Sequence, residues 1–306
     1  MRNILITGSH GMVGRNLIEV LSKKKNYLLL PDRKELDLLN KQKIRNYIKN
    51  KKPNIIIHCA SLVGGILFNK QNQYKLLQEN IELNLNLINT AYEAGIKKLI
   101  NFSSSCVYPN NNNIHKENNI FDGNFEKTNE GYAISKYVSM KLCEYINRQK
   151  NFNYKTIIPC NLYGKWDLFD KNKSHLISSA ILKIHNAKIN NLKVIKIWGT
   201  GKPKREFLYC SDLANFVKFA IKNYSKIPEF INVGFNKDYS VEYYYNTICK
   251  IINYFPKFEF DHSKPDGVYQ KKMNVSKLKK IGGFRQTSLK KGIEQTYRFY
   301  LDHYEN

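Results

Sequence analysis

Tyr132 and Lys136 are the residues whose types and spacing point most directly to chemistry, in the stretch EGYAISK at 130–136. Residues four apart lie on one face of a helix. An ammonium beside a phenol stabilises the phenolate, so Lys136 should lower the tyrosine pKa from its usual value of about 10. Such a phenol could exchange a proton with a carbonyl or alcohol near neutral pH. The alternative is an amphipathic helix that carries the pair by chance, in a chain with 21 Tyr and 50 Lys+Arg.

A glycine-rich turn far upstream indicates a nucleotide site. The stretch GSHGMVG at 8–14 follows an apolar run at 3–7 and opens a helical pattern. In that context the first glycine permits a tight turn, the second lets a diphosphate approach, and the third lets the helix pack on the strand. The sequence therefore predicts a dinucleotide site, and the predicted binding residues of the turn are Gly8, His10, Gly11, Met12, Val13 and Gly14.

The local sequence leaves the choice of dinucleotide open. Asp32, at the end of the second predicted strand, could bind a ribose 2′-hydroxyl and favour NAD. Arg33 follows it directly, and His10 and Arg15 lie in or beside the glycine turn. A 2′-phosphate requires cations, so these three residues favour NADP.

The elements that must position these residues alternate along the first half of the chain. Strand-like runs lie at 3–7, 27–30, 55–58, 99–102 and 155–159, and helical stretches lie at 12–24, 41–50, 73–94 and 131–149. This alternation predicts an α/β fold with a doubly wound parallel sheet. The carboxyl ends of its strands should line the active crevice. Ser104 follows the fourth run and could bind a substrate oxygen there, although a turn serine is the alternative.

The second half is less regular. Its predicted elements are a strand at 194–198, a Gly/Pro loop at 199–203, a helix at 211–222 with Ser or Asp at its start, a strand at 230–234, a helix after 240, a loop at 264–267 and a last helix at 289–304. We predict a dinucleotide-binding domain from residues 1–164 plus about 208–236. A smaller α/β substrate domain should comprise 165–207 plus about 237–306.

Composition excludes several classes of protein. No stretch of 18 apolar residues suggests a membrane span, and the first strand begins at once, which argues against a signal peptide. The six cysteines are scattered without metal-ligand spacing, as expected of a reducing cytoplasm. The net charge of +25 comes from dispersed lysines in an Asn-, Ile- and Tyr-rich chain. A nucleic-acid site would gather them on one element.

Several longer stretches carry a family resemblance. Taken with the Ser…Tyr-x-x-x-Lys pattern, the chain resembles the extended short-chain dehydrogenases/reductases over almost its whole length, and within them the GDP-L-fucose synthases. The stretches are GSHGMVG at 8–14, VGGI at 63–66, SSSCVYP at 103–109, TNEGYAISK at 128–136, NLYG at 161–164, SHLI at 174–177, WGTGKPKREFLY at 198–209 and SKPDG at 263–267.

The resemblance implies a reaction and the residues that perform it. It implies epimerisation of GDP-4-keto-6-deoxy-D-mannose at C3 and C5, with Cys106 as the base and His175 as the acid, followed by NADPH-dependent reduction at C4. Tyr132 would then donate a proton, while Lys136 holds the cofactor ribose and Ser104 steadies the reacting oxygen. Further cofactor-binding positions that it implies are Arg33, Asn161, Leu162 and His175.

The resemblance also implies a substrate site and an assembly. The substrate-binding positions are Lys183, where the family often has Arg, and Trp198, Arg205 and Asp266. A homodimer is expected, formed by the helices at 73–94 and 131–149. Lys165 replaces a usual proline, and Trp166-Asp167-Leu168 replaces His-Asp-Asn, so the shape of the pocket and the turnover are uncertain at this loop.

Two rival functions remain at this point. One is another nucleotide-sugar enzyme, a 4-epimerase or a 4,6-dehydratase. A dehydratase requires a carboxylate near the position after the serine, where this chain has Ser105-Cys106. The other is a non-catalytic dinucleotide-sensing or RNA-binding protein, for which Tyr132, Cys106 and His175 would be dispensable and RNA binding would depend strongly on salt.

Overall fold

A parallel six-stranded sheet forms the centre of the fold in the computed structural model, which describes residues 3–22, 27–111, 113–170, 173–264, 266–282 and 284–305. The strands lie in the order β10-β6-β4-β3-β1-β2. Their bounds are β1 Asn3–Thr7, β2 Tyr27–Leu29, β3 Ile55–His58, β4 Lys98–Phe102, β6 Asn153–Pro159 and β10 Phe230–Val233. The chain order reverses direction at β1, between β2 and β3, and a ligand crevice is expected outside that point.

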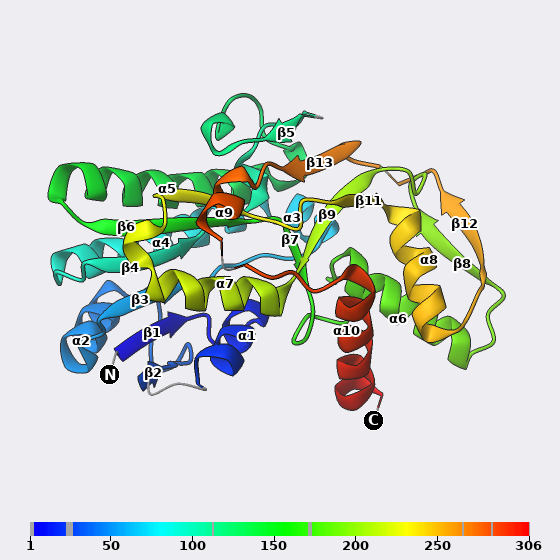
Figure 1. The fold of residues 1–306 in the computed structure, drawn as a ribbon, viewed down its shortest axis with the longest axis horizontal. Helices are drawn as coiled ribbons and strands as arrows, with labels where there is room; N and C mark the ends of the chain where they lie inside the picture. Colours follow the sequence, from blue (N-terminus) through cyan, green and yellow to red (C-terminus); the bar gives the residue numbers. More distant parts are fainter. Residues whose placement is uncertain are drawn as a thin grey trace.

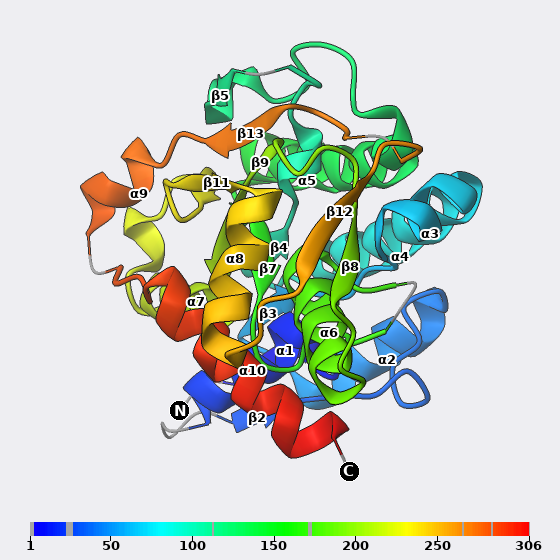
Figure 2. The same ribbon diagram turned by 90° about the vertical axis from the view of Figure 1, so that its right-hand side faces the viewer.

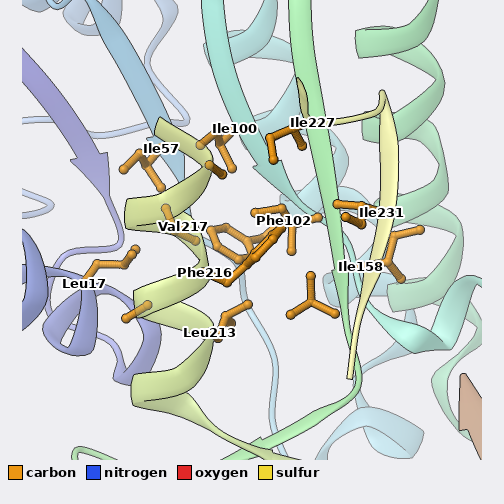
Figure 3. Packing of buried hydrophobic residues seen from close by; sticks show 14 of the residues in the cluster. Leu17, Ile57, Ile100, Phe102, Ile158, Leu213, Phe216, Val217, Ile227 and Ile231 are labelled. Carbon is orange, nitrogen blue, oxygen red and sulfur yellow. The ribbon is translucent and has the colours of Figure 1, made fainter. Parts of the chain in front are cut away.

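Helices cover both faces of this sheet because its central strands are apolar on both sides. On β1, Ile4 and Ile6 belong to one core cluster and Leu5 to another. The helices on the first face are α1 Met12–Leu21 and α7 Cys210–Lys222, and those on the second are α2 Lys41–Lys51, α4 Gln73–Glu93 and α5 Glu130–Lys150. Figure 3 shows Leu17 of α1 and Phe216 of α7 against the sheet. The predicted doubly wound α/β fold is confirmed.

A second group of elements lies at one end of the sheet (Figure 1) and faces the viewer in Figure 2. Its helices α6, α8 and α10 share a separate apolar cluster with the strands beside them. The bounds are β7 Asn161–Tyr163, α6 Leu176–Ile189, β8 Val194–Trp198, β9 Lys204–Tyr209, β11 Asp238–Ser240, α8 Val241–Ile252, β12 Lys257–Asp261, β13 Gln270–Met273 and α10 Leu289–Tyr304. Strand β9 pairs with β7, β11 and β13, so it is the hub of this end.

Short elements complete the chain, and most of them were not predicted. They are α3 Ile66–Gln71, α9 Ser276–Ile281, β5 Ile114–His115 and the 3-10 turns η1 Ser105–Val107, η2 Glu117–Asn119, η3 Lys127–Asn129 and η4 Tyr224–Lys226. The sequence QKKM of β13 has no alternation that could have revealed a strand. Within the described ranges, no helix has both the length and the apolar character needed to cross a bilayer.

Several predicted helix bounds differ from the structure, by one residue at α2, α4, α5 and α7 and by more at α1. Helix α1 ends at Leu21, and the predicted continuation to 24 lies partly outside the described residues. Helix α7 begins one residue early, with Tyr209 at the N-cap and no side-chain cap. Ser211 and Asp212 lie in its first turn, as expected, and Ser211 donates to Asn16 Oδ1 at 2.6 Å.

Candidate active site

The glycine turn has a shape that suits a dinucleotide diphosphate. Gly8 has a φ of +68°, and a Cβ there would lie 2.7 Å from the backbone nitrogen of Ala60. A Cβ on Gly14 would lie 2.3 Å from the Gly8 oxygen, whereas at Gly11 the nearest such atom is 3.5 Å away. The backbone thus excludes a side chain at Gly8 and at Gly14, and it leaves space beside Gly11. No side chain caps α1, so its first N–H groups can bind an anion.

The Asp32 carboxylate is held by the turn that follows β2. Its Oδ1 accepts the N–H of Glu35 at 2.8 Å, and this bond lowers the pKa of Asp32, with the nearby charge of His10 acting in the same direction. His10 is exposed, and its Nδ1 lies 3.1 Å from Ser9 Oγ. Asp32 and His10 therefore lie at the same corner, where a 2′-hydroxyl or a 2′-phosphate of the cofactor is expected.

One of the three cations considered for that corner is engaged elsewhere. Arg15 donates from Nε to the carbonyl of His10 at 3.0 Å, and its guanidinium lies 4.5 Å from the centre of the Trp166 ring. Arg33 is exposed in the turn after β2. Arg15 thus supports the turn and stacks on an indole, and His10 and Arg33 remain as the candidates for a 2′-phosphate.

The chemical centre lies where β3 and β4 end and α5 begins. Tyr132 is 8% exposed, and hydrogen bonds to Ser61 and Ser104 stabilise its phenolate form. Ser104 is the N-cap of η1, and its Oγ accepts the N–H of Cys106 at 3.3 Å. The half-buried thiol of Cys106 is close enough to influence the charge of the phenol. The structure therefore brings Ser104, Cys106 and Tyr132 together.

Burial reverses the predicted direction of the tyrosine pKa. Burial raises the pKa of Tyr132 above its ordinary value, Cys106 adds to this rise, and the interactions with the Ser61 and Ser104 hydroxyls only partly oppose it. Lys136 Nζ lies 5.7 Å from the ring centre and donates to Phe102 O at 3.0 Å. The prediction that this pKa is lowered is therefore wrong. A protonated phenol suits a proton donor.

Lys136 itself is a buried cation, 3% exposed. Burial lowers its pKa to about 8, and Cys59 opposes that shift. The lysine is held by a main-chain carbonyl, with no carboxylate among the groups that shift its pKa. Burial therefore makes the charge of this ammonium costly.

Ser61 is a site residue that the sequence reasoning missed. Its Oγ donates to Asn80 Oδ1 at 2.9 Å, and Asn80 of α4 also accepts the N–H of Leu62 at 2.7 Å. These bonds fix the segment after β3 next to Tyr132. The strand-end rule that identified Ser104 after β4 would also have identified Ser61 after β3.

His175 lies at the N-cap of α6, with an exposed side chain that makes no cap bond. The carbonyl of the preceding Ser174 lies 3.2 Å from where a Cβ on Gly65 would be. Gly65 in turn begins α3, which follows the segment that carries Ser61. The main chain of His175 is thus placed beside the same segment as the chemical centre.

The predicted substrate residues lie on strands and loops at the other end. Trp198, at the end of β8, is 44% exposed. Lys183 of α6 lies 5.5 Å from the centre of its ring and donates to Lys196 O at 3.1 Å. Lys264 Nζ lies 6.0 Å from the same ring centre, so the partly exposed indole has two cations beside it.

Arg205 and Asp266 meet through the loop 266–268, and both side chains are bonded within the protein. Arg205 donates to Val268 O at 2.6 Å and to Asp266 O at 3.2 Å. The Asp266 carboxylate accepts from Thr200 N at 2.6 Å and from Thr200 Oγ1 at 2.7 Å. Asp266 therefore holds the 199–201 turn in place. Position 265 of the SKPDG stretch lies outside the described residues.

Asn161 and Leu162 lie on β7, which pairs with β9. Asn161 Nδ2 donates to Glu206 O at 3.0 Å, and Leu162 packs against the core. Their side chains are engaged with the protein, so a cofactor could use only their backbone. Among the described residues, no group of three His, Cys, Asp or Glu side chains could hold a metal ion.

The unusual loop at 165–168 packs between two helices. Trp166 has a φ of +67°, and its Nε1 donates to Glu19 of α1 at 2.9 Å. On its other side the ring contacts Phe299 and His303 of α10, with ring centres 4.6 and 5.5 Å apart. The residue that replaces the usual histidine thus joins α1 to α10.

Several known proteins are similar to this chain in sequence and in fold. Residues 4–234 match the NAD dependent epimerase/dehydratase family. The chain is 45% identical to GDP-L-colitose synthase of Yersinia pseudotuberculosis, over 99% of each chain. It is 40% identical to GDP-L-fucose synthase of Azorhizobium caulinodans, over 98% of this chain and 96% of the relative. GDP-mannoheptose C4 reductase of Campylobacter jejuni with NADP bound superposes with a TM-score of 0.88 at 29% identity, covering 98% of both chains.

Proposed function

Because the chain belongs to the NAD dependent epimerase/dehydratase family, we propose that it is an NADPH-dependent epimerase/reductase of the GDP-L-fucose synthase type. It would invert C3 and C5 of GDP-4-keto-6-deoxy-D-mannose and then reduce C4. The observation that carries this proposal is the gathering of Ser104, Cys106 and Tyr132 at the strand ends beside the glycine turn. The resemblance inferred from the sequence motifs is confirmed, and the rival functions are not favoured.

Each group at this centre has a distinct part in the proposal. Cys106 removes a proton from a carbon beside the ketone, and His175 returns one on the opposite face. The buried phenol of Tyr132 donates a proton to the C4 oxygen, which Ser104 holds by a hydrogen bond. When bound, the nicotinamide cofactor supplies the hydride that reduces C4.

NADPH is the proposed cofactor, and the glycine turn fits its diphosphate as described above. The reductase relative was solved with NADP bound. In this chain the cations for a 2′-phosphate are His10 and Arg33, and Lys136 would hold the nicotinamide ribose. The bond from Glu35 to Asp32 keeps that carboxylate engaged, which reduces its conflict with a phosphate.

The substrate end supports a nucleoside diphosphate sugar. Arg205 supplies a planar cation for the diphosphate, and Trp198 and Lys183 supply an aromatic face and a second charge. We keep the two-domain division at 164, 208 and 236 as part of the proposal. The separate apolar cluster of α6, α8 and α10 supports it, whereas Met273, Val275 and Leu278 pack with the sheet. A homodimer through α4 and α5, which pack on each other, and a cytoplasmic location also remain predictions.

A second product is favoured by one comparison, the 45% identity to GDP-L-colitose synthase. Colitose differs from fucose in lacking the hydroxyl at C3. The same site would then act on a 3-deoxy ketone and invert C5 only. The groups that move protons would be unchanged.

One experiment tests the proposal and separates the two products. The purified protein is incubated with NADPH in heavy water and with either ketone, with or without the 3-hydroxyl. We expect oxidation of NADPH, deuterium at C5, and deuterium at C3 only in the fucose-type substrate. Tyr132→Phe should slow reduction by about 10²- to 10⁴-fold while exchange continues, and Cys106→Ser should abolish exchange.

A matched control is Tyr137→Phe, since Tyr137 lies on the same helix but stacks on Phe121 with ring centres 4.4 Å apart. Its activity should equal that of the parent. If Tyr132→Phe and Cys106→Ser both behave like the parent protein, the site assignment is wrong. If the parent protein converts neither ketone, the proposed substrate is wrong.

A further inference from the structure

One buried carboxylate, that of Glu206 on β9, bonds to the segments on both sides of its own strand. The residue is 1% exposed. Its Oε1 accepts the N–H of Asn236, in the turn before β11, at 2.6 Å. Its Oε2 accepts the N–H of Met273, the last residue of β13, at 2.8 Å. Because β9 lies between β11 and β13, this single side chain joins three strands.

The carboxylate acts where the main-chain pairing of β9 and β13 stops. The last pair between these two strands is Lys271 with Arg205, and beyond it Met273 pairs with β5. Hydrogen bonds from N–H groups to a carboxylate are roughly twice as strong as those between neutral groups. Glu206 therefore holds the end of β13 on β9 after the backbone ladder has ended.

The surroundings leave this carboxylate little freedom to turn. A Cβ on Gly234 would lie 2.5 Å from Glu206 Oε1, so a larger residue there would displace the carboxylate. The Gly234 carbonyl is itself held by Gln286 Nε2 at 2.8 Å. The Glu206 carbonyl accepts from Asn161 Nδ2 at 3.0 Å. Both the side chain and the main chain of Glu206 are thus fixed.

The loop that precedes β13 holds Arg205. Arg205 Nη1 donates to Val268 O at 2.6 Å, and Nη2 donates to Asp266 O at 3.2 Å. Arg205 and Glu206 are neighbours on β9, so their side chains leave opposite faces of the strand. Glu206 can therefore influence the guanidinium through β13, because the acceptors of the guanidinium lie just before that strand.

We propose that Glu206 is a positioning residue for Arg205: its carboxylate holds β13 on β9, and β13 places the carbonyls that orient the guanidinium toward the diphosphate of a GDP-sugar. The part about the GDP-sugar rests on the proposed function, whereas the coupling between carboxylate and guanidinium does not. The alternative is that Glu206 only satisfies two buried N–H groups, which would affect stability and leave Arg205 unchanged.

Titratable groups of four neighbouring elements act on this carboxylate. Lys272 of β13 stabilises its charge and Asp238 of β11 opposes it, and these two side chains lie 3.9 Å apart. Cys160, after β6, and Tyr244 of α8 stay neutral because burial raises the pKa of each. Burial raises the pKa of Glu206 to about 7, and its two hydrogen bonds to N–H groups oppose the rise. Protonation can therefore weaken the contact without a substitution.

The first test uses the substrate-free protein and the NMR signal of the Arg205 Nε–H group, assigned with Arg205→Lys. In Glu206→Gln the side chain can accept from one N–H group but turns its own NH₂ toward the other. Strand β13 should loosen, and the Arg205 signal should shift and broaden. In Glu259→Gln, which changes an exposed carboxylate on β12, the signal should match the parent. An unchanged Arg205 signal in a folded Glu206→Gln protein overturns the proposal.

A titration of the parent protein covers the case in which Glu206→Gln does not fold. The amide signals of Asn236 and Met273 are followed together with the Arg205 Nε–H signal as the pH is lowered. When the carboxyl takes up a proton, its bonds to the two amides weaken, so all three signals should move with one midpoint near pH 7. An Arg205 signal that stays constant, or that moves with a different midpoint, overturns the proposal.

Turnover connects the pair to the substrate. Glu206→Gln should raise the KM for the GDP-sugar about 10-fold, the effect of losing one hydrogen bond to a charged group, and leave kcat and the KM for NADPH unchanged. The double variant with Arg205→Lys should have the KM of Arg205→Lys alone, because the carboxylate acts through the guanidinium. A KM raised by the product of the two single effects overturns the proposal. If the parent converts no GDP-sugar, the proposed function fails, and the NMR tests still decide the positioning role.

Discussion

The two ends of the candidate site are formed in different ways. At the nucleotide end, comprising the turn at 8–14 and the segments after β3 and β4, the main chain sets the shape. A Cβ on Gly14 would meet the Gly8 oxygen at 2.3 Å. At the substrate end, comprising Lys183, Trp198, Arg205 and Asp266, side chains set the shape. There a Cβ on Gly201 would meet the Phe260 ring at 2.4 Å.

This difference indicates how far each end of the site can change its shape for a different ligand. Backbone atoms of a sheet and its turns cannot move without breaking hydrogen bonds, whereas a side chain can change rotamer. A dinucleotide is common to the whole family, and a rigid main-chain site suits a constant ligand. A varied set of sugars is better served by side chains on loops.

Matched glycine substitutions give the largest expected contrast between the ends. Gly14→Ala should lower the free energy of unfolding by about 3 kcal/mol, because the new methyl group meets backbone on the sheet side. Gly201→Ala should cost about 1–2 kcal/mol, mainly for its φ of +72°, because the Phe260 ring can move aside. Urea denaturation measures both. Equal losses would remove the contrast between a rigid and an adaptable end.

Because the Lys136 ammonium is buried, we expect that removing it stabilises the fold and abolishes the reduction. Lys136→Met should raise the free energy of unfolding at pH 7 by about 1–3 kcal/mol while abolishing reduction. The folded pKa of about 8 lies below the ordinary value of 10.5. The penalty is thus complete below pH 8 and disappears as the pH rises to 10.5.

The control for this prediction is Lys150→Met, at the exposed end of the same helix. It should bring no gain. Denaturation curves at pH 7 and pH 10 distinguish the two cases, since the gain from Lys136→Met should shrink at the higher pH. A gain that is independent of pH would show that packing, and not the buried charge, is responsible.

Arg205→Lys has the smallest expected effect and tests the substrate end. Lysine keeps the charge but loses the planar fork, and the bonds to Val268 and Asp266 weaken. The KM for the GDP-sugar should rise about 10-fold, which corresponds to about 1.4 kcal/mol, while the KM for NADPH should not change. Lys204→Arg, at the exposed neighbouring position, should leave both constants unchanged. A rise in the KM for NADPH would show that the ends are coupled.

Elements with a local sequence signal could be predicted, and elements that depend on distant pairing could not. The strands at 3–7 and 55–58 and the last helix at 289–304 were placed correctly, because periodic apolar patterns specify them. The glycine turn was recognised because its φ angles and close contacts require glycine. Strand β13, with the polar sequence QKKM, was missed because its pairing with β9 depends on residues far away in the chain.

At the chemical centre, the local sequence did not predict the direction of the Tyr132 pKa shift. Tyr132 and Lys136 were correctly placed on one helix, yet the direction of the tyrosine pKa was wrong, since burial by surrounding elements outweighs a neighbour four residues away. Ser61 gained its place only through folding, because it reaches Tyr132 from the end of another strand.

The amino-acid sequence by itself determined the doubly wound sheet, the glycine turn and the helix that carries Tyr132, because each depends on local periodicity or on the conformational freedom of glycine. The tertiary structure alone decided which side chains are buried and that Arg15 is engaged by the His10 carbonyl and the Trp166 ring. Those properties depend on desolvation and on distances between residues that are remote in the chain, and neither quantity is encoded in any single stretch of sequence.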